Sequence, residues 1–185
     1  MRTMETARLS IRPFKSDDWP DLYEYLSQEE VVRYEPYGVF TEKAARREAL
    51  RRSRDSAFWA VCLQDGGKLI GNLYLAEQAF GTWELGFVFN QTYHGNGYAT
   101  EAAFALVDDA FKNRQAHRVA ALCNPLNTPS WKLLERLGMR REGHLLQNVY
   151  FKKDEAGGPL WVDTFAYGIL SCEWQERDKN GASAN

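Results

Sequence analysis

Apolar and polar residues alternate with a period of two over residues 9–14, LSIRPF, which predicts a strand. Two further apolar runs, residues 57–64 and 69–76, lie on either side of the segment DGGK at 65–68. Because glycine accepts a positive φ, that segment predicts a tight hairpin turn between two strands. Four more strands are predicted over residues 83–90, 118–123, 140–151 and 160–170.

Two helices are predicted between the first strand and the hairpin. Ser16 is followed by two aspartates, and a hydroxyl cap with acidic residues in the first turn complements the free amides of a helix start. Thr41 opens a second helix over residues 42–55 in the same way. This second helix carries five arginines, which we interpret as a solvated face because acidic residues interrupt them, with an acidic partner as the alternative.

Two more helices follow the strand at 83–90. Apolar side chains recur at helical spacing over residues 98–111, with acidic residues on the other side. The helix at 131–137 should end at Gly138, which can adopt a left-handed cap. The order of elements predicts a mixed α/β domain with a parallel crossover through the helix at 98–111. We expect a single domain over residues 1–175 and a disordered tail over 176–185.

Composition excludes several classes of function. The 185 residues have a formal charge of −2 with both signs mixed, so neither a nucleic acid nor an anionic membrane is expected as a partner. No long apolar run opens the chain, which argues against a signal peptide or a membrane span. The three cysteines and three histidines have no ligand spacing, so we expect no disulfide framework, no metal and a reducing, cytoplasmic setting.

A pair of glycines joins a predicted strand to a predicted helix. Gly95 and Gly97 stand in the stretch HGNGYATEA, at a helix start whose free amide groups and positive dipole attract anions. A tight turn is the simpler interpretation of a lone GxG. The chain lacks the GK[ST] of a Walker loop and the third glycine of a dinucleotide fold. The residues of this candidate pyrophosphate cradle are His94, Gly95, Asn96, Gly97, Tyr98, Ala99 and Thr100.

A second motif makes the interpretation more specific. Residues 127–139 read NTPSWKLLERLGM, residues 8–13 read RLSIRP, and residues 95–102 read GNGYATEA. With these motifs, the chain over residues 7–170 resembles the GNAT superfamily of N-acetyltransferases, and within it the RimJ/RimL-type branch of ribosomal-protein N-terminal acetyltransferases. The resemblance implies a mostly antiparallel, mixed sheet of seven strands flanked by about four helices. In that sheet the strands at 83–89 and 118–123 splay apart.

The resemblance also implies the reaction and its ligands. Acetyl-CoA would be the donor and a primary amine the acceptor, in direct transfer within a ternary complex. The pantetheine arm would lie between the splayed strands, paired with backbone groups of Phe87, Val88 and Phe89 and contacting Asn127. Ser130 would donate to the departing thiolate, although a hydroxyl in the first turn of a helix also bonds its own backbone.

Glu84 is the candidate general base. Alternation places it on one face of the strand at 83–90, where a single carboxylate stands among apolar residues. A solvated strand residue is the alternative. Some relatives place an acid in the strand after Gly143, where this chain has Gln147 and Asn148, so a water relay stays open as the route for the proton.

The acceptor is not specified by the sequence. The aromatic and mildly acidic segment at 31–38 joins the first two helices and is expected to contribute to acceptor choice. Ribosomal protein N-termini and small amines are both served on this scaffold, and a homodimer is a further expectation. The alternative function is a catalytically silent acyl-CoA-binding regulator, favoured by the missing acid in the late strand.

Overall fold

The fold is built around one mixed sheet. The computed structural model describes the backbone of residues 2–182 and the side chains of residues 2–177. Eight strands lie in the order β1-β2-β3-β4-β5-β6-β8-β7, and every neighbouring pair is antiparallel except β5 and β6. The strands are β1 Met4–Glu5, β2 Leu9–Pro13, β3 Phe58–Leu63, β4 Leu69–Glu77, β5 Thr82–Phe89, β6 Arg118–Cys123, β7 Arg140–Lys153 and β8 Pro159–Leu170. The eighth strand, beyond the seven predicted, is β1, which is too short to show alternation in the sequence.

The described residues form six α-helices rather than about four. They are α1 Trp19–Leu26, α2 Glu29–Val32, α3 Glu42–Arg52, α4 Tyr98–Asn113, α5 Thr128–Arg136 and α6 Ser171–Ala182, with short 3-10 turns at η1 Ser16–Asp18, η2 Ala79–Gly81 and η3 Gln91–Tyr93. The additional helices are the single turn α2 and the C-terminal α6.

Helix α6 replaces part of the expected tail. Residues 176–182 continue this helix, and residues 183–185 lie outside the described residues. Trp174 is 1% exposed, packs beside Phe104 of α4 and donates from Nε1 to the Asp108 carboxylate at 3.0 Å. One large buried ring therefore holds a helix whose other positions are too polar to predict it.

One of the two predicted caps is confirmed. Thr41 Oγ1 accepts from the backbone N–H of Ala44 at 3.2 Å, as expected of a helix N-cap. Ser16 is not a cap but the first residue of the 3-10 turn. The N-cap of that turn is Lys15, and the Asp18 carboxylate accepts from the Lys15 backbone N–H and, through two hydrogen bonds, from the Arg12 guanidinium. A bidentate ion pair therefore fixes the first helical segment to β2.

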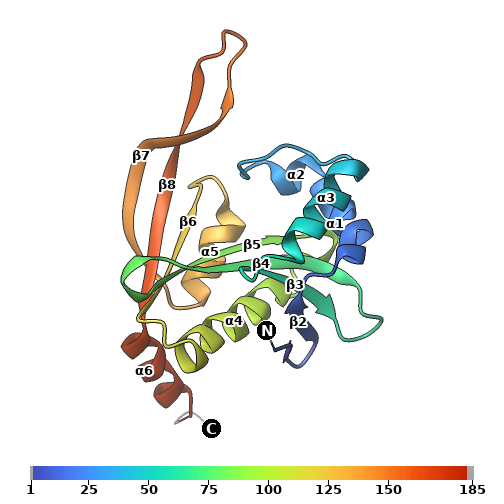
Figure 1. Ribbon diagram of the computed structural model, residues 1–185. Helices are drawn as coiled ribbons and strands as arrows, with labels where there is room; N and C mark the ends of the chain where they lie inside the picture. Colours follow the sequence, from blue (N-terminus) through green and yellow to red (C-terminus); the bar gives the residue numbers. More distant parts are fainter. Residues whose placement is uncertain (1, 183–185) are drawn as a thin grey trace.

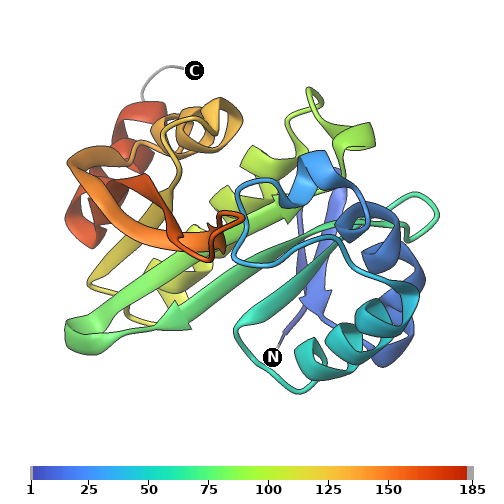
Figure 2. The same cartoon turned by 90° about the horizontal axis from the view of Figure 1, so that it is seen from above.

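Helices cover both faces of the sheet. Figure 1 shows α4 below the strands and α1, α2 and α3 above them, with the hairpin of β7 and β8 extending far beyond the sheet. The same arrangement is visible from above in Figure 2. The larger core cluster joins α4, α5 and α6 to the strands, and the smaller one joins α1, α2 and α3 to β3 and β4. The predicted α/β fold and the crossover through α4 are confirmed.

The central strands part as predicted. Strand β5 pairs with β6 only through Thr82, Trp83 and Glu84. Beyond that point β5 continues beside β4 to Phe89, and β6 continues beside β8 to Cys123. Over the last part of both strands, β5 and β6 therefore form no backbone pairing with each other.

Candidate active site

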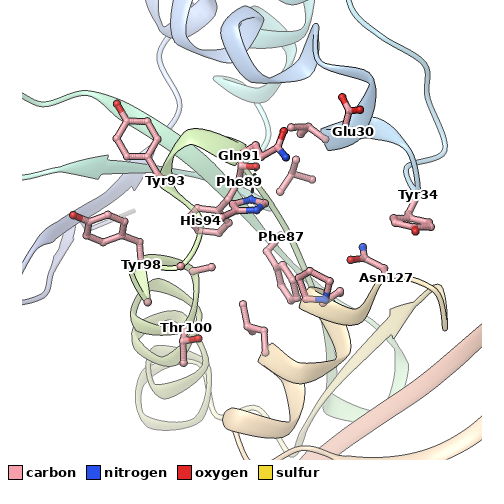
Figure 3. A pocket seen from close by; sticks show the side chains of 18 of the residues that line it. Glu30, Tyr34, Phe87, Phe89, Gln91, Tyr93, His94, Tyr98, Thr100 and Asn127 are labelled. Atoms are coloured by element: carbon pink, nitrogen blue, oxygen red, sulfur yellow. Dashed lines mark hydrogen bonds between the residues drawn. The ribbon is translucent and has the colours of Figure 1, made fainter.

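A cavity of about 670 Å³ opens where β5 ends and α4 begins. Its walls come from β5, the loop after it, the first turn of α4, helix α5 and the segment around α2 (Figure 3). We call it the first cavity. The predicted donor-binding residues that line it are Phe87, Val88, Phe89, His94, Gly95, Gly97, Tyr98, Ala99, Thr100, Asn127 and Ser130. Nearly all of the residues chosen from sequence are thus brought together by the fold.

The glycine loop presents a bare helix tip to this cavity. Gly97 is the N-cap of α4 with φ +80°, and no side chain caps the helix. The backbone hydrogen bonds of the helix begin with the N–H of Glu101, which donates to the Gly97 carbonyl at 3.0 Å. The preceding three amides are the free donors of a first helical turn. Gly95 also has φ +80°, and a Cβ there would meet no atom within 4 Å, so the space above the tip is open.

Asn96 has a different place from the one predicted. It does not line the first cavity, and its side chain bonds the carbonyl oxygens of Tyr93 and His94. Its own carbonyl accepts from Arg8 at 2.9 Å, and Arg8 pairs with Glu101 at 2.6 Å. Asn96 therefore braces the loop and ties it to the start of β2.

Among the polar residues at the first cavity that the sequence did not predict are Arg136 and Gln91. Arg136, in the last turn of α5, donates from Nε to the Thr100 hydroxyl at 3.2 Å and places a positive charge beside the tip of α4. Gln91 also lines the cavity, next to His94 (Figure 3). Sequence spacing gave no signal for Arg136, because it reaches α4 from a helix about forty positions later.

His94 is held by the strand that precedes it. Its Nε2 lies 3.2 Å from the carbonyl oxygen of Phe89, at hydrogen-bond distance. This contact fixes the ring at the end of β5, where Figure 3 shows it beside Phe89 and Gln91.

A second cavity, of about 840 Å³, adjoins the first along β5. It extends between the α2–α3 segment, the central strands and the β7–β8 hairpin, and we call it the second cavity. Its walls hold many aromatic rings, among them those of Tyr37, Phe58, Tyr74 and Phe151. The carboxylates that line it are Glu35, Glu48, Glu84 and Asp163.

The two cavities meet at a small set of residues. The residues that line both are Tyr34, Glu35, Phe87, Val88, Asn127 and Ser130. Tyr34 donates from its hydroxyl to the Leu126 carbonyl at 3.3 Å and so connects the α2 segment with the loop before α5. Figure 3 shows Tyr34 and Asn127 facing each other across this junction.

Glu35 lies at the junction and is partly buried. Burial raises the pKa of its carboxyl group from 4.5 to about 7, against the opposing effects of a hydrogen bond with Tyr37 and the charge of Arg52. A carboxylate with this pKa is half ionised near neutral pH. The sequence predicts a role in acceptor choice for the segment at 31–38 but does not single out Glu35 within it.

Glu84 lies farther from the junction. It lines the second cavity but not the first, near the end of β5 that still pairs with β6. Its carboxylate accepts a hydrogen bond from the Gln78 amide at 3.2 Å. Three residues of extended strand, on the order of 10 Å, separate it from Phe87 at the junction.

Asn127 and Ser130 sit at the start of α5 and line both cavities. Asn127 is the N-cap, but its side chain makes no cap hydrogen bond, which leaves the amide directed to the junction. Ser130 contacts the thiol of Cys123 at the end of β6. Burial raises the pKa of that thiol to about 11, against the opposing hydrogen bond with Ser130, so Cys123 is a neutral core residue.

Two features are absent from the described residues. No group of three or more histidine, cysteine, aspartate or glutamate side chains in that part of the chain could hold a metal ion. Likewise, none of the helices described is long and apolar enough to cross a membrane.

Comparison with known proteins gives consistent matches. Residues 8–140 match the family model described as "Acetyltransferase (GNAT) domain". The uncharacterized N-acetyltransferase YnaD of Bacillus subtilis is 42% identical over 174 residues, covering 91% of this chain and 97% of its own. The crystal structure of a GNAT-family acetyltransferase from Bacillus anthracis has a TM-score of 0.83 and 37% identity, covering 93% of this chain and 100% of its own.

A more distant structure carries ligands. Spermidine N-acetyltransferase from Vibrio cholerae, solved in complex with CoA and spermine, has a TM-score of 0.76 and 17% identity. It covers 92% of this chain and 99% of its own. At that identity the likeness concerns the fold alone.

Proposed function

The chain belongs to the acetyltransferase (GNAT) domain family and is an N-acetyltransferase by that membership, and we propose that it transfers an acetyl group from acetyl-CoA to a primary amine. Donor and acceptor would meet in a ternary complex, the donor in the first cavity and the acceptor in the second. The observation that carries this proposal is the uncapped tip of α4 beside the parted ends of β5 and β6.

The residues of the first cavity fit coenzyme A. Free amides at the tip of α4, the open space over Gly95 and the charge of Arg136 suit a diphosphate. The free backbone edge of Phe87, Val88 and Phe89 suits an extended chain carrying amide groups, such as pantetheine. Acetyl-CoA would supply an acetyl thioester at the junction of the two cavities.

The protein must then help an amine to react. An alkyl amine has a pKa of about 10, so only about one molecule in a thousand carries a free electron pair at neutral pH. A proton acceptor and a donor for the thiolate are therefore needed. Ser130 is our proposed thiolate donor because it lines both cavities. For the proton acceptor, Glu84 is the carboxylate predicted from the sequence, and a water relay is the alternative.

The finer features of the function are also proposals. Motifs that resemble the RimJ/RimL-type branch favour a protein N-terminus as acceptor, and the spermidine N-acetyltransferase neighbour favours a small amine. We propose a cytoplasmic protein. We also propose a homodimer, supported by exposed apolar side chains on the β7–β8 hairpin such as Leu146 (70% exposed) and Trp161 (50% exposed).

The proposed activity is tested by release of free thiol from acetyl-CoA with a panel of amines. The panel should contain N-terminal peptides, polyamines, arylalkylamines and aminoglycosides, with products identified by a mass increase of one acetyl group. Thiol release that depends on one class of amine supports the proposal. Tight CoA binding without thiol release from any amine would favour the silent acyl-CoA-binding regulator instead.

A further inference from the structure

The place where the two cavities meet is the only place in the described structure where both substrates of the proposed reaction can touch. A residue that takes a proton from the amine must reach this junction, because proton transfer requires hydrogen-bond distance or a single bridging water. Of the six residues that line both cavities, Glu35 is the one with a carboxylate.

Other carboxylates near the site lie in one cavity only. Glu84 and Asp163 line the second cavity, and Glu30 lines the first. Asp163 is already occupied, since it accepts hydrogen bonds from the backbone N–H of Gln147 and contacts the His144 ring at 2.8 Å. Geometry alone therefore separates Glu35 from its competitors.

We propose that the Glu35 carboxylate binds the ammonium group of the acceptor and takes its proton, which makes Glu35 a catalytic residue. The inference rests on the proposed function. The ammonium ion loses one proton to Glu35, and its electron pair forms the new C–N bond to the acetyl carbon. The C–S bond breaks, the thiolate takes the second proton from nitrogen through Ser130 or water, and Glu35 returns its proton to solvent.

The backbone around Glu35 keeps the carboxylate in position. The Glu35 N–H bonds the Val32 carbonyl at 3.0 Å, and the Phe40 N–H bonds the Leu26 carbonyl at 2.9 Å. With the hydrogen bond from Tyr34 to Leu126, these contacts fix the segment at both ends and in the middle. A preorganised group of this kind is what proton transfer requires.

The electrostatic environment suits the same role. A carboxyl group with a pKa of about 7 is ionised often enough to accept a proton and basic enough to hold it. Tyr37, through a hydrogen bond, and Arg52 of α3, through its charge, are the two groups that act on the Glu35 carboxylate and lower its pKa against the effect of burial. The other titratable groups that line one or both cavities are Glu30, Tyr34, Glu48, Arg51, Tyr74, Glu84, Tyr93, His94, Tyr98, Cys123, Arg136 and Asp163.

The test compares three variants, each of which replaces one carboxylate by an amide. Glu35→Gln removes the proposed proton acceptor, and Glu84→Gln removes the carboxylate predicted from sequence. Glu29→Gln is the matched control, because Glu29 is exposed on the same segment and lines neither cavity. Thiol release is measured with the best amine of the panel from pH 5.5 to 9.

We expect Glu35→Gln to lower kcat by about 100-fold, the usual scale of general-base loss, with KM for acetyl-CoA within about twofold of the wild-type value. The acidic limb of the pH–rate profile near pH 7 should disappear in Glu35→Gln and persist in Glu29→Gln and Glu84→Gln. Glu35→Asp keeps a carboxylate and should retain that limb at reduced kcat, which a merely structural role would not produce.

Each failure has its own signature. An active wild type whose acidic limb survives in Glu35→Gln overturns the assignment of Glu35 and leaves the acetyltransferase activity standing. Loss of the limb in Glu84→Gln alone moves the role to Glu84. A wild type that binds CoA yet releases no thiol with any amine overturns the proposed function, and this inference with it. Circular dichroism and CoA affinity of each variant show that the fold is retained.

Discussion

The two cavities that adjoin along β5 are lined by different kinds of groups. The first combines the backbone amides and glycines at the tip of α4 and one strand edge with side chains such as His94 and Arg136, and the second presents side chains from the helices, the central strands and the β7–β8 hairpin. Backbone groups are the same in every sequence that keeps the fold, whereas side chains change with every substitution. A backbone-built cavity therefore suits a ligand shared by a whole family, and a side-chain-built cavity suits an individual acceptor.

The largest effect should follow from breaking the wall of the second cavity at Glu48. Arg52 is 2% exposed, and its Nε lies 2.8 Å from the Glu48 carboxylate. Although burial opposes it, hydrogen bonding from Arg51 and Arg52 lowers the pKa of Glu48 to about 2. Glu48→Gln leaves a buried guanidinium without its counter-ion and should cost about 3 kcal/mol of the free energy of unfolding at pH 7.

Urea unfolding measures this loss, and Glu42→Gln serves as the control. Glu42 pairs with Arg46 in solvent, where both side chains are more than half exposed, so its loss should be about 0.5 kcal/mol or less. The lowered pKa means that the stabilising effect of Glu48 is complete above pH 4.5 and is lost as the pH falls toward 2. Equal losses in the two variants would show that the interior pair adds nothing.

The next effect concerns pH and Glu35. Its pKa is raised, so the folded protein holds this proton more tightly than the unfolded chain. The stability that results is complete below pH 4.5 and is lost as the pH rises through about 7. Relative to Glu35→Gln, the wild type should therefore lose about 2–3 kcal/mol between pH 4.5 and 8. Urea unfolding at both pH values checks this, and parallel behaviour of the two proteins would contradict it.

These effects also show what the sequence could predict. The loop around Gly95 and Gly97 can be predicted from the sequence because the strand end, the loop and the helix start are consecutive in the chain. Local backbone preferences determine such a turn. The splay of β5 and β6 and the positions of Asn127 and Ser130 followed from resemblance to a family. Glu35 could not be found in this way, since its importance depends on which residues from β5 and α5 lie opposite it.

The missed elements have physical reasons of the same kind. Helix α6 is stabilised mainly by Trp174 packing against α4, which is a tertiary contact without a local pattern. Ser16 has the residue type of a cap, yet the turn begins one residue earlier than a Ser16 cap requires, because Asp18 bonds both the Lys15 amide and Arg12 of the neighbouring strand. Arg136 acts on α4 across the fold. Tertiary context overrode local preference at each of these positions.

Ser130 sharpens the comparison because it belongs to both cavities. Removing the hydroxyl in Ser130→Ala should lower kcat by about 10-fold, the scale of one lost hydrogen bond to a charged group, with KM for acetyl-CoA nearly unchanged. Ser130→Thr retains a hydroxyl and should recover most of the rate. Steady-state kinetics with varied acetyl-CoA measure both constants. A change confined to KM would place Ser130 in donor binding alone.

The smallest effect is expected in the first cavity. Arg136→Ala should raise KM for acetyl-CoA about 5-fold and leave KM for the amine unchanged, because one charge-assisted contact among several backbone donors is lost. Lys132→Ala is the control, since this exposed residue on the same helix does not line the cavity. An effect of Arg136→Ala on amine KM would show that the two cavities do not act separately.

The short pairing between β5 and β6 leaves the sheet as two parts joined by a short ladder, while one core packs beneath both. Strands β1 to β5 form one part and β6 to β8 the other, and three residue pairs of parallel ladder connect them. A ligand that hydrogen-bonds along the open edges would serve as the missing length of strand. Hydrogen exchange in the last residues of β5 and β6 should then slow when CoA is present, and the two parts of the sheet should move as one body.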